Sequence, residues 1–351
     1  MDTAERLRGE TRTVWATALC FALGTGAGFL LLQGPPRPLT GPGSLSAPVA
    51  AIAGLIAAVA FLVSTVQHRR GETAPMPRWQ AVVSDVSAAA LTIAFAAVSG
   101  LGVLLAGVVF GAGLQGFASG ALGGALIAGV AAAVAGRFAY TAGVDLRTRD
   151  LSALLFGFLA IGTLFAMATA ADPHWWQLNF SQLGLGGHGW AFNGTLVVAG
   201  LLFATIGSYI GRDLHRLLGD GALRRIAVVV VLWAATGIAL AVVGFVPIEV
   251  NRPAHWIAAI GTLVLFAAAA LVTLLTLPGP PRALVIATIG LGILLAGAIV
   301  LHIPVRLYSA AGLEAIAVGL GLVWMTTLVR VLAVLVPDIS RPSARATLSS
   351  L

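Results

Sequence analysis

The chain has 351 residues, of which 59% are hydrophobic and only 9% are charged. Soluble globular domains carry roughly 25% charged residues, so this composition excludes a soluble protein and favours one that lies largely in a lipid bilayer. The formal net charge is +7. The arginines are spread over short segments between apolar runs and form no basic patch, so we predict no nucleic-acid partner.

Apolar runs of about 18 or more residues recur along the chain, and each could cross a hydrocarbon core of about 30 Å. Runs of this length without alternating polarity predict helices, not the strands of a barrel. We therefore expect an all-α, polytopic transmembrane helical bundle of about ten spans. The expected helices cover residues 14–32, 48–66, 81 to a turn near 113–118, that turn to 136, 151–170, 190–210, 226–246, 254–277, 283–301 and 313–336.

The arginines predict how the spans are oriented, because cytoplasmic loops keep an excess of Arg near helix ends. Placing both termini in the cytoplasm leaves only Arg37, Arg252 and Arg306 outside. The absence of lysine and the abundance of Ala, Gly and Arg are typical of a high-GC genome, so we expect a multi-pass protein of the bacterial plasma (inner) membrane. Basic segments divide the chain into a four-helix membrane module (1–150), a six-helix membrane core (151–337) and a polar cytoplasmic tail (338–351).

A glycine-rich stretch precedes the fourth span. Gly116, Gly120 and Gly124 recur every four residues, a spacing that predicts one helix face on which another backbone can approach closely. Two interpretations follow from this spacing. The glycines could pack inside the bundle, or they could contact a partner membrane protein or a second copy in a homodimer.

A polar and aromatic segment interrupts the apolar pattern at residues 172–194, which read DPHWWQLNFSQLGLGGHGWAFNG. On the predicted orientation residues 172–187 of this segment, residues 247–253 and residues 302–311 all face the exoplasmic side. Together they bring many titratable and polar side chains to one face of the membrane. The candidate binding residues are His174, Trp176, Asn193, Arg252, His302 and Arg306, and the candidate catalytic residues are His188, Glu249, His255 and Glu314.

Glu314 is the most informative of these residues. It lies about one turn inside the last span, where an ionised carboxylate is costly and usually has a partner or faces water. We expect Arg306, Arg252 or a histidine to be that partner. Asn193 is comparable, because a buried amide in lipid needs hydrogen-bond partners.

Three interpretations of this polar cluster stay open. Histidines and carboxylates could bind a divalent metal, although no HExxH or CxxC spacing is present, so we assign no metal ligands and no cofactor. The same groups could act as general acid and base on a lipid headgroup or envelope substrate. Finally, His, Trp and Arg at headgroup depth can serve only to anchor the helices at the membrane interface.

Several short elements resemble the bacterial six-helix membrane family catalogued as domain of unknown function 998, over about residues 151–336. They are NFSQLG, FNGTLVVAGLL, GFVPIEVNRPAHW and GLEAIAVGLGLVWM. The family's S-x-L-G element, helix-opening asparagine, Phe-x-Pro with a following histidine, and acidic residue would correspond to residues 181–184, Asn193, residues 245–247 with His255, and Glu314. The resemblance implies an architecture more than a reaction.

We therefore expect an integral membrane protein whose six C-terminal helices form an exoplasmic-facing cavity. The cavity would bind or process a lipid or a lipid-linked component of the cell envelope. If the site is catalytic, His255 or His188 would be the base, Glu249 or Glu314 the acid or orienting group, and Arg306 or Arg252 would hold an anionic headgroup. The alternative is a transporter or a non-catalytic accessory subunit of a membrane complex.

Overall fold

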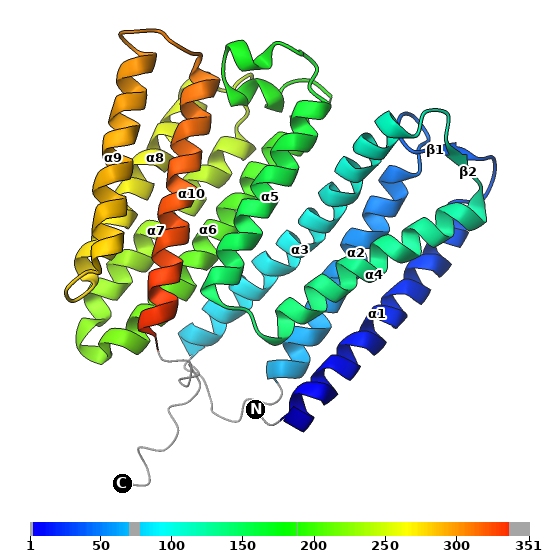
Figure 1. Ribbon diagram of the computed structural model, residues 1–351, viewed down its shortest axis with the longest axis horizontal. Helices are drawn as coiled ribbons and strands as arrows, with labels where there is room; N and C mark the ends of the chain where they lie inside the picture. Colours follow the sequence, from blue (N-terminus) through cyan, green and yellow to red (C-terminus); the bar gives the residue numbers. More distant parts are fainter. Residues whose placement is uncertain (1–2, 70–77, 188, 337–351) are drawn as a thin grey trace. The chain divides into compact units, whose positions relative to one another are not determined.

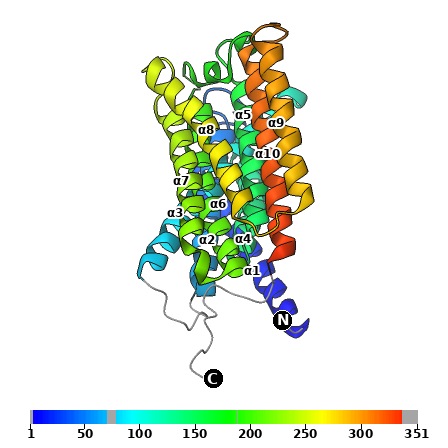
Figure 2. The ribbon, with the colours of Figure 1, turned by 90° about the vertical axis from the view of Figure 1, so that its left-hand side faces the viewer.

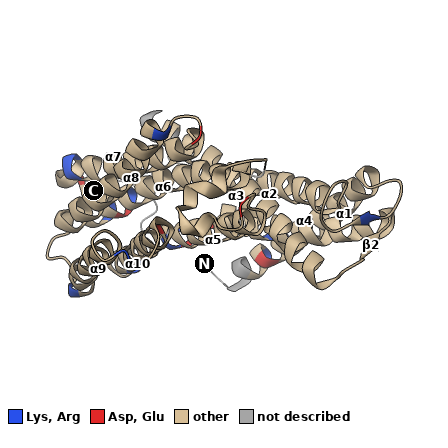
Figure 3. Cartoon of the chain, turned by 90° about the horizontal axis from the view of Figure 1, so that it is seen from above, with Lys and Arg blue, Asp and Glu red and all other residues tan. Residues whose placement is uncertain are grey.

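The computed structural model describes residues 3–69, 78–187 and 189–336. Within these ranges it contains ten helices that are long and apolar enough to cross a membrane. Charged residues are sparse along the helices (Figure 3). The predicted all-α transmembrane fold is therefore confirmed. The polar tail predicted at residues 338–351 lies outside the described residues.

The chain divides into two compact units, Met1–Leu146 and Arg147–Leu351. The described residues of unit 1 form four long helices and two very short strands that pair antiparallel, with Arg37 opposite Ser119. The elements of unit 1 are α1 (Thr3–Leu31), β1 (Arg37–Pro38), α2 (Ser46–Arg69), α3 (Arg78–Gly113), β2 (Ala118–Ser119) and α4 (Ala121–Val144).

The core of unit 1 is built from small and aliphatic side chains, with Leu32, Leu45 and Val49 against Ala128 and Ala132 of α4. Glycine lets α1 and α4 approach closely. A Cβ atom on Gly28 of α1 would lie 3.0 Å from the Cα atom of Ala125 in α4. This backbone contact explains why the helices of unit 1 are rich in Gly and Ala.

The three regularly spaced glycines do not share a helix face, which corrects the sequence prediction. Gly116 lies in the turn before α4 with a φ of 77°, and Gly120 is the N-cap of α4. Only Gly124 is helical, and it is buried against Leu32 and Leu45 of its own unit. The spacing suggested a continuous helix because glycine does not mark by itself where a helix begins.

Within its described residues, unit 2 contains six long helices and three short 3-10 helices. The connections α5–α6 and α9–α10 lie at the same end of this unit (Figure 1), which we call the island end. The elements of unit 2 are α5 (Thr148–Ala168), η1 (Trp175–Gln177), η2 (Phe180–Gly184), α6 (Gly189–Leu218), η3 (Asp220–Ala222), α7 (Leu223–Phe245), α8 (Arg252–Thr276), α9 (Arg282–His302) and α10 (Ala310–Leu335).

Helices α6 and α7 pack backbone against backbone. A Cβ atom on Gly200 would collide with the carbonyl oxygen of Gly237, and a Cβ atom on Gly237 would collide with the carbonyl oxygen of Gly200. Small residues at such positions let transmembrane helices approach closely and gain van der Waals contact. The α6–α7 pair is therefore closely packed, with direct contact between the two backbones.

An aromatic cluster joins α6, α7, α8 and α10. The ring of Trp233, which is 0% exposed, lies 5.6 Å from Phe266 and 6.3 Å from Trp324, and Phe203 stacks on it at 6.2 Å. Figures 2 and 3 show α9 and α10 together on one side of unit 2, and α7 and α8 on the other. The cluster therefore fills the interior between these pairs and fixes α10 relative to α6.

Most helices extend beyond the predicted ends. We expected α6 to end at residue 210, whereas it continues to Leu218, and α4 continues to Val144 instead of residue 136. Arginine is a good helix former, so a basic segment does not end a helix by itself. The helix α6 ends at Leu218, and the next residue is Gly219, whose φ of 69° suits a residue without a side chain.

Candidate functional site

The polar segment between α5 and α6 is fastened across the island end of unit 2. We call its described residues 172–187 the island; it carries η1 and η2 (Figure 1). Two bonds attach η1 and its neighbour to the start of α10. The Ser309 hydroxyl donates to the Trp176 carbonyl at 2.6 Å, and the Ala311 N–H donates to the Leu178 carbonyl at 2.9 Å. The island is thus held in one position over the helices.

The island presents a serine to a buried histidine. Ser181 Oγ lies 2.8 Å from Nε2 of His255, which stands in the first turn of α8 and is 3% exposed. The other ring nitrogen of His255, Nδ1, lies 2.8 Å from the Val246 carbonyl oxygen. A carbonyl can only accept, so in the neutral ring Nδ1 carries the proton and Nε2 accepts from the serine hydroxyl. We call these two residues the Ser–His pair.

The backbone around His255 explains why its ring is held in this direction. Helix α7 ends at Phe245, and the connection to α8 carries the Val246 carbonyl past the ring. Asn251 caps α8, with its side-chain oxygen accepting from the N–H of Ala254 at 3.0 Å. The cap fixes where α8 begins. It therefore fixes the height of His255, which is the fourth residue of that helix.

Glu314 fixes the residue next to Ser181. Its Oε2 atom accepts a hydrogen bond from the Phe180 N–H at 2.7 Å. The histidines His255 and His302 both lie close enough to Glu314 to interact with its charge. We predicted an arginine or a histidine as the partner of this carboxylate. The hydrogen-bond partner is a backbone N–H, and among the described residues no arginine forms an ion pair with Glu314.

His302 is the second histidine that interacts with the charge of Glu314. Its Nδ1 atom lies 3.0 Å from the Tyr308 carbonyl oxygen, and the two rings stack with centroids 6.0 Å apart. The Tyr308 hydroxyl donates to the Ala298 carbonyl at 2.5 Å, which folds the α9–α10 connection back onto α9. His302 is therefore positioned by its own loop.

Asn193 holds the C-terminal end of η2. Its Nδ2 atom donates to the Gly184 carbonyl at 3.0 Å. Gly184 must lack a side chain here, because a Cβ atom would collide with Oδ1 of Asn193. This bond satisfies the membrane-embedded amide predicted from the sequence, and it makes Asn193 a positioning residue for the segment that carries Ser181.

Several predicted site residues point to solvent or lipid instead. His174 is 67% exposed in its side chain and lies 3.5 Å from Asp172. Four other predicted site residues are exposed as well: Trp176, Glu249, Arg252 and Arg306. In the described ranges, none of their side chains has a hydrogen bond or ion pair to the Ser–His pair or to Glu314. Arg306 has a φ of 55° and lies at the turn of the α9–α10 connection. His188 lies outside the described residues.

The arrangement offers proton transfer more than metal binding. In the part of the chain that the structure describes, no group of three or more His, Cys, Asp or Glu side chains could hold a metal ion. A serine hydroxyl bonded to an oriented imidazole can act as a nucleophile with its base. The nearby carboxylate can stabilise the positive charge that the imidazole gains when it takes the proton.

Sequence reasoning did not identify the role of Ser181, nor of the two backbone groups that complete the site. Ser181 entered only as part of the S-x-L-G element, and it lies 74 residues from its partner His255. Neither the Phe180 N–H nor the Val246 carbonyl has a side-chain signature. Ser181 could have been singled out because it carries the only side-chain hydroxyl in the sequence of the island: no other Ser, Thr or Tyr occurs between residues 172 and 187.

The comparisons with known proteins give one match. Residues 153–331 match the family described as "Protein of unknown function (DUF998)". No curated protein and no solved structure matches the chain. The matched region includes Ser181, Asn193, His255 and Glu314, as the resemblance of their short motifs predicted. Since the match covers just over half of the chain, the protein belongs to the DUF998 family.

Proposed function

We propose that unit 2 cleaves or transfers an acyl ester of a membrane lipid or of a lipid-linked envelope component at the island end. Ser181 is the nucleophile and His255 the general base. The observation that carries this proposal is the Ser181 Oγ to His255 Nε2 distance of 2.8 Å, with Nδ1 of the same ring held by the Val246 carbonyl. This geometry directs the free lone pair of the imidazole at the hydroxyl proton.

The reaction balances with groups at hand. Ser181 Oγ bonds to the ester carbonyl carbon, and its proton moves to Nε2 of His255. When the ester C–O bond breaks, the departing alkoxide takes that proton and leaves an acyl-serine. Water, or a second alcohol for transfer, then attacks the acyl carbon and gives its proton to Nε2. The proton returns to Ser181 Oγ as the acid or the new ester leaves.

The carboxylate and the amide support this step from outside the reacting atoms. The imidazolium formed during the reaction lies within electrostatic reach of Glu314. The bond from Phe180 to Glu314 at one end of η2 and the bond from Asn193 to Gly184 at the other hold Ser181 in place. Such fixed positioning lowers the entropic cost of reaching the transition state.

A lipid substrate fits the surroundings of the site. Large apolar side chains are exposed around the island end, including Trp176 and Leu178 of the island, Trp256 and Ile257 of α8, and Leu307 of the α9–α10 connection. Aromatic residues at such positions are typical of the membrane–water interface, where the ester groups of glycerolipids lie. On the predicted orientation, this end faces the exoplasmic side of the plasma membrane.

The test is covalent labelling of the purified full chain with a fluorophosphonate that carries an alkyl chain. An activated serine attacks the phosphorus and expels fluoride, and peptide mass spectrometry identifies the modified residue. We expect the adduct on Ser181, its loss in Ser181→Ala, and labelling slowed about 100-fold or more in His255→Gln. Ser152→Ala is the matched control, since Ser152 donates only to the Arg149 carbonyl of its own helix end.

If Ser181 is not labelled in wild-type protein that thermal unfolding shows to be folded, catalysis by the Ser–His pair is refuted. In that case the bonds of the island only fasten it to the helices. The alternative function, a transporter or a non-catalytic accessory subunit, would then be preferred. A contact with a partner membrane protein or a second copy near Gly116 and Gly120 stays a prediction, while Gly124 faces its own unit.

A further inference from the structure

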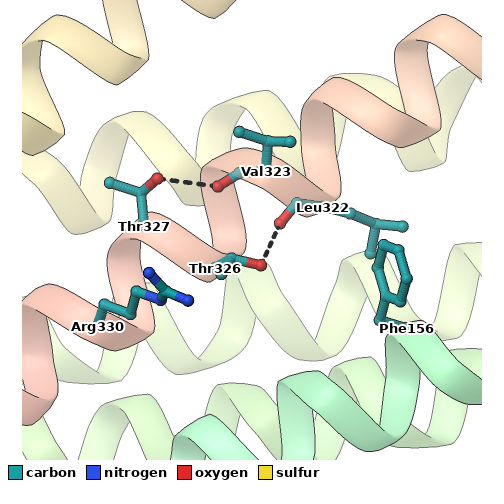
Figure 4. A pocket seen from close by; sticks show the side chains of 6 residues that line it. All are labelled: Phe156, Leu322, Val323, Thr326, Thr327 and Arg330. Atoms are coloured by element: carbon teal, nitrogen blue, oxygen red, sulfur yellow. Dashed lines mark hydrogen bonds between the residues drawn. The ribbon is translucent and has the colours of Figure 1, made fainter.

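A pocket lies between α5 and α10, away from the island end. It has a volume of about 300 Å³ and is lined by Phe156 of α5 and by five residues of α10: Leu322, Val323, Thr326, Thr327 and Arg330. Figure 4 shows these residues along one strip, with Phe156 opposite the helix that carries the others. Leu322 and Arg330 are eight residues apart, so the strip follows α10 for about 12 Å.

Arg330 brings a positive charge into this strip, and the neighbouring helices supply no counter-charge for it. Among the described residues, Arg330 has no ion pair or side-chain hydrogen bond. Helices α5 and α10 contain one acidic residue each, Asp150 and Glu314, and α9 contains none. Asp150 is engaged by Arg149 and by the Arg147 N–H. Glu314 is 16 residues from Arg330, or about 24 Å along the helix.

Helix α6 also contacts α10, and its one acidic residue, Asp213, is occupied as well. Asp213 of α6 is buried, accepts a hydrogen bond from Thr148 and lies 3.8 Å from Arg216. A cation inside a membrane-spanning helix is rare and normally has a partner or extends to the interface. Arg330 lies five residues before the end of α10, about 8 Å along the helix from that end.

The rest of the pocket is built for a chain, not for a small polar molecule. Phe156 and Val323 are exposed apolar side chains. The hydroxyls of Thr326 and Thr327 donate to the carbonyls of Leu322 and Val323, at 2.8 and 2.9 Å. These hydroxyls therefore leave only acceptor lone pairs, and Arg330 is the donor that can meet an anion.

We propose that this pocket binds an anionic phospholipid. The headgroup phosphate pairs with the Arg330 guanidinium, whose planar set of donors matches phosphate oxygens. A headgroup hydroxyl donates to Thr326 or Thr327, and an acyl chain lies along Leu322, Val323 and Phe156. The bound lipid supplies a counter-charge for Arg330 that Asp150 of α5 and Glu314 of α10 do not provide. This site is separate from the Ser–His pair and does not depend on the function proposed for it.

The experiment counts lipids retained by the purified full chain. The protein is titrated with phosphatidylglycerol in a neutral detergent, and native mass spectrometry measures the occupancy of each bound state. We expect Arg330→Gln to weaken the tightest binding event about tenfold. Arg282→Gln is the matched control, because Arg282 is exposed at the first residue of α9 and does not line the pocket. The phosphatidylglycerol affinity of Arg282→Gln should stay at the wild-type value.

Two further measurements, one on a third variant and one with a competing anion, make the result decisive. Val323→Trp should fill the strip and weaken lipid binding while leaving the charge of Arg330 in place. Equal losses in Arg330→Gln and Arg282→Gln would overturn the proposal, since they would show general charge attraction. Displacement of the lipid by inorganic phosphate at a similar concentration would overturn it too, because it would show an anion site with no role for the acyl chain. Unchanged unfolding temperatures confirm that each variant is folded.

Discussion

Gly184→Ala tests whether the end of η2 positions Ser181. The new Cβ atom would collide with Oδ1 of Asn193 and lie 3.1 Å from both Cγ and Nδ2 of that residue. The amide must move, so the bond from Asn193 to the Gly184 carbonyl is lost. A neutral hydrogen bond contributes about 1 kcal/mol, and overpacking costs about 1–3 kcal/mol. Together we expect about 2–4 kcal/mol of local destabilisation.

The assay is the rate of fluorophosphonate labelling at Ser181, measured with the thermal unfolding temperature of the same sample. A displacement of about 1 Å at a reacting group can cost about 100-fold in rate, and we expect a loss of that order. Gly187→Ala is the matched control in the same segment. Gly187 has no neighbour within 4 Å of an added Cβ and has no positive φ, so labelling should be unchanged.

The double variant that combines Gly184→Ala with Asn193→Ala separates the collision at residue 184 from other effects of the alanine. Asn193→Ala removes the atoms that an alanine at residue 184 would meet. In the double variant the collision is gone, so its destabilisation should be smaller than the sum of the two single changes by about 1–2 kcal/mol. If Gly184→Ala labels at the wild-type rate and unfolds like Gly187→Ala, the positioning argument is wrong.

Two other predictions follow from the packing and charge of unit 2. Gly237→Ala should lower the unfolding temperature strongly, because its Cβ would collide with the Gly200 carbonyl, while Gly261→Ala, with open space around it, should be neutral or stabilising by up to about 1 kcal/mol. Glu314→Gln keeps an oxygen for the Phe180 N–H but loses the charge, so we expect stability near wild type and labelling slowed about tenfold. Glu314→Ala should lose both, which thermal unfolding would show.

The sequence was sufficient for the spans but not for their ends. Uninterrupted apolar runs define a membrane helix because the bilayer demands both length and internal hydrogen bonding. The ends depend on capping and on backbone conformation. Helix α6 passes through Arg212 and Arg216 and ends only at Leu218, before Gly219. No hydropathy signal distinguishes those arginines from residues in a loop.

The site could be located from the sequence but not assembled. The polar segment, His255 and Glu314 stand out because such groups are rare in an apolar chain. Four histidines were equivalent in the sequence, whereas the structure buries His255 beside Ser181 and leaves His174 exposed. Partners separated by 74 residues meet through packing of whole helices, which no local spacing encodes.

The segments that hold Ser181 and His255 are both positioned by the packing of α6 against α7. A Cβ atom on Gly244, near the end of α7, would collide with the carbonyl oxygen of Asn193 and lie 3.0 Å from the N atom of Val197. Two residues further on, the Val246 carbonyl holds His255, while Asn193 itself holds the segment that carries Ser181. A backbone contact that only glycine permits therefore sets the distance between the nucleophile and its base. Any side chain at residue 244 would push the segments that hold Ser181 and His255 apart, even though it would touch neither residue.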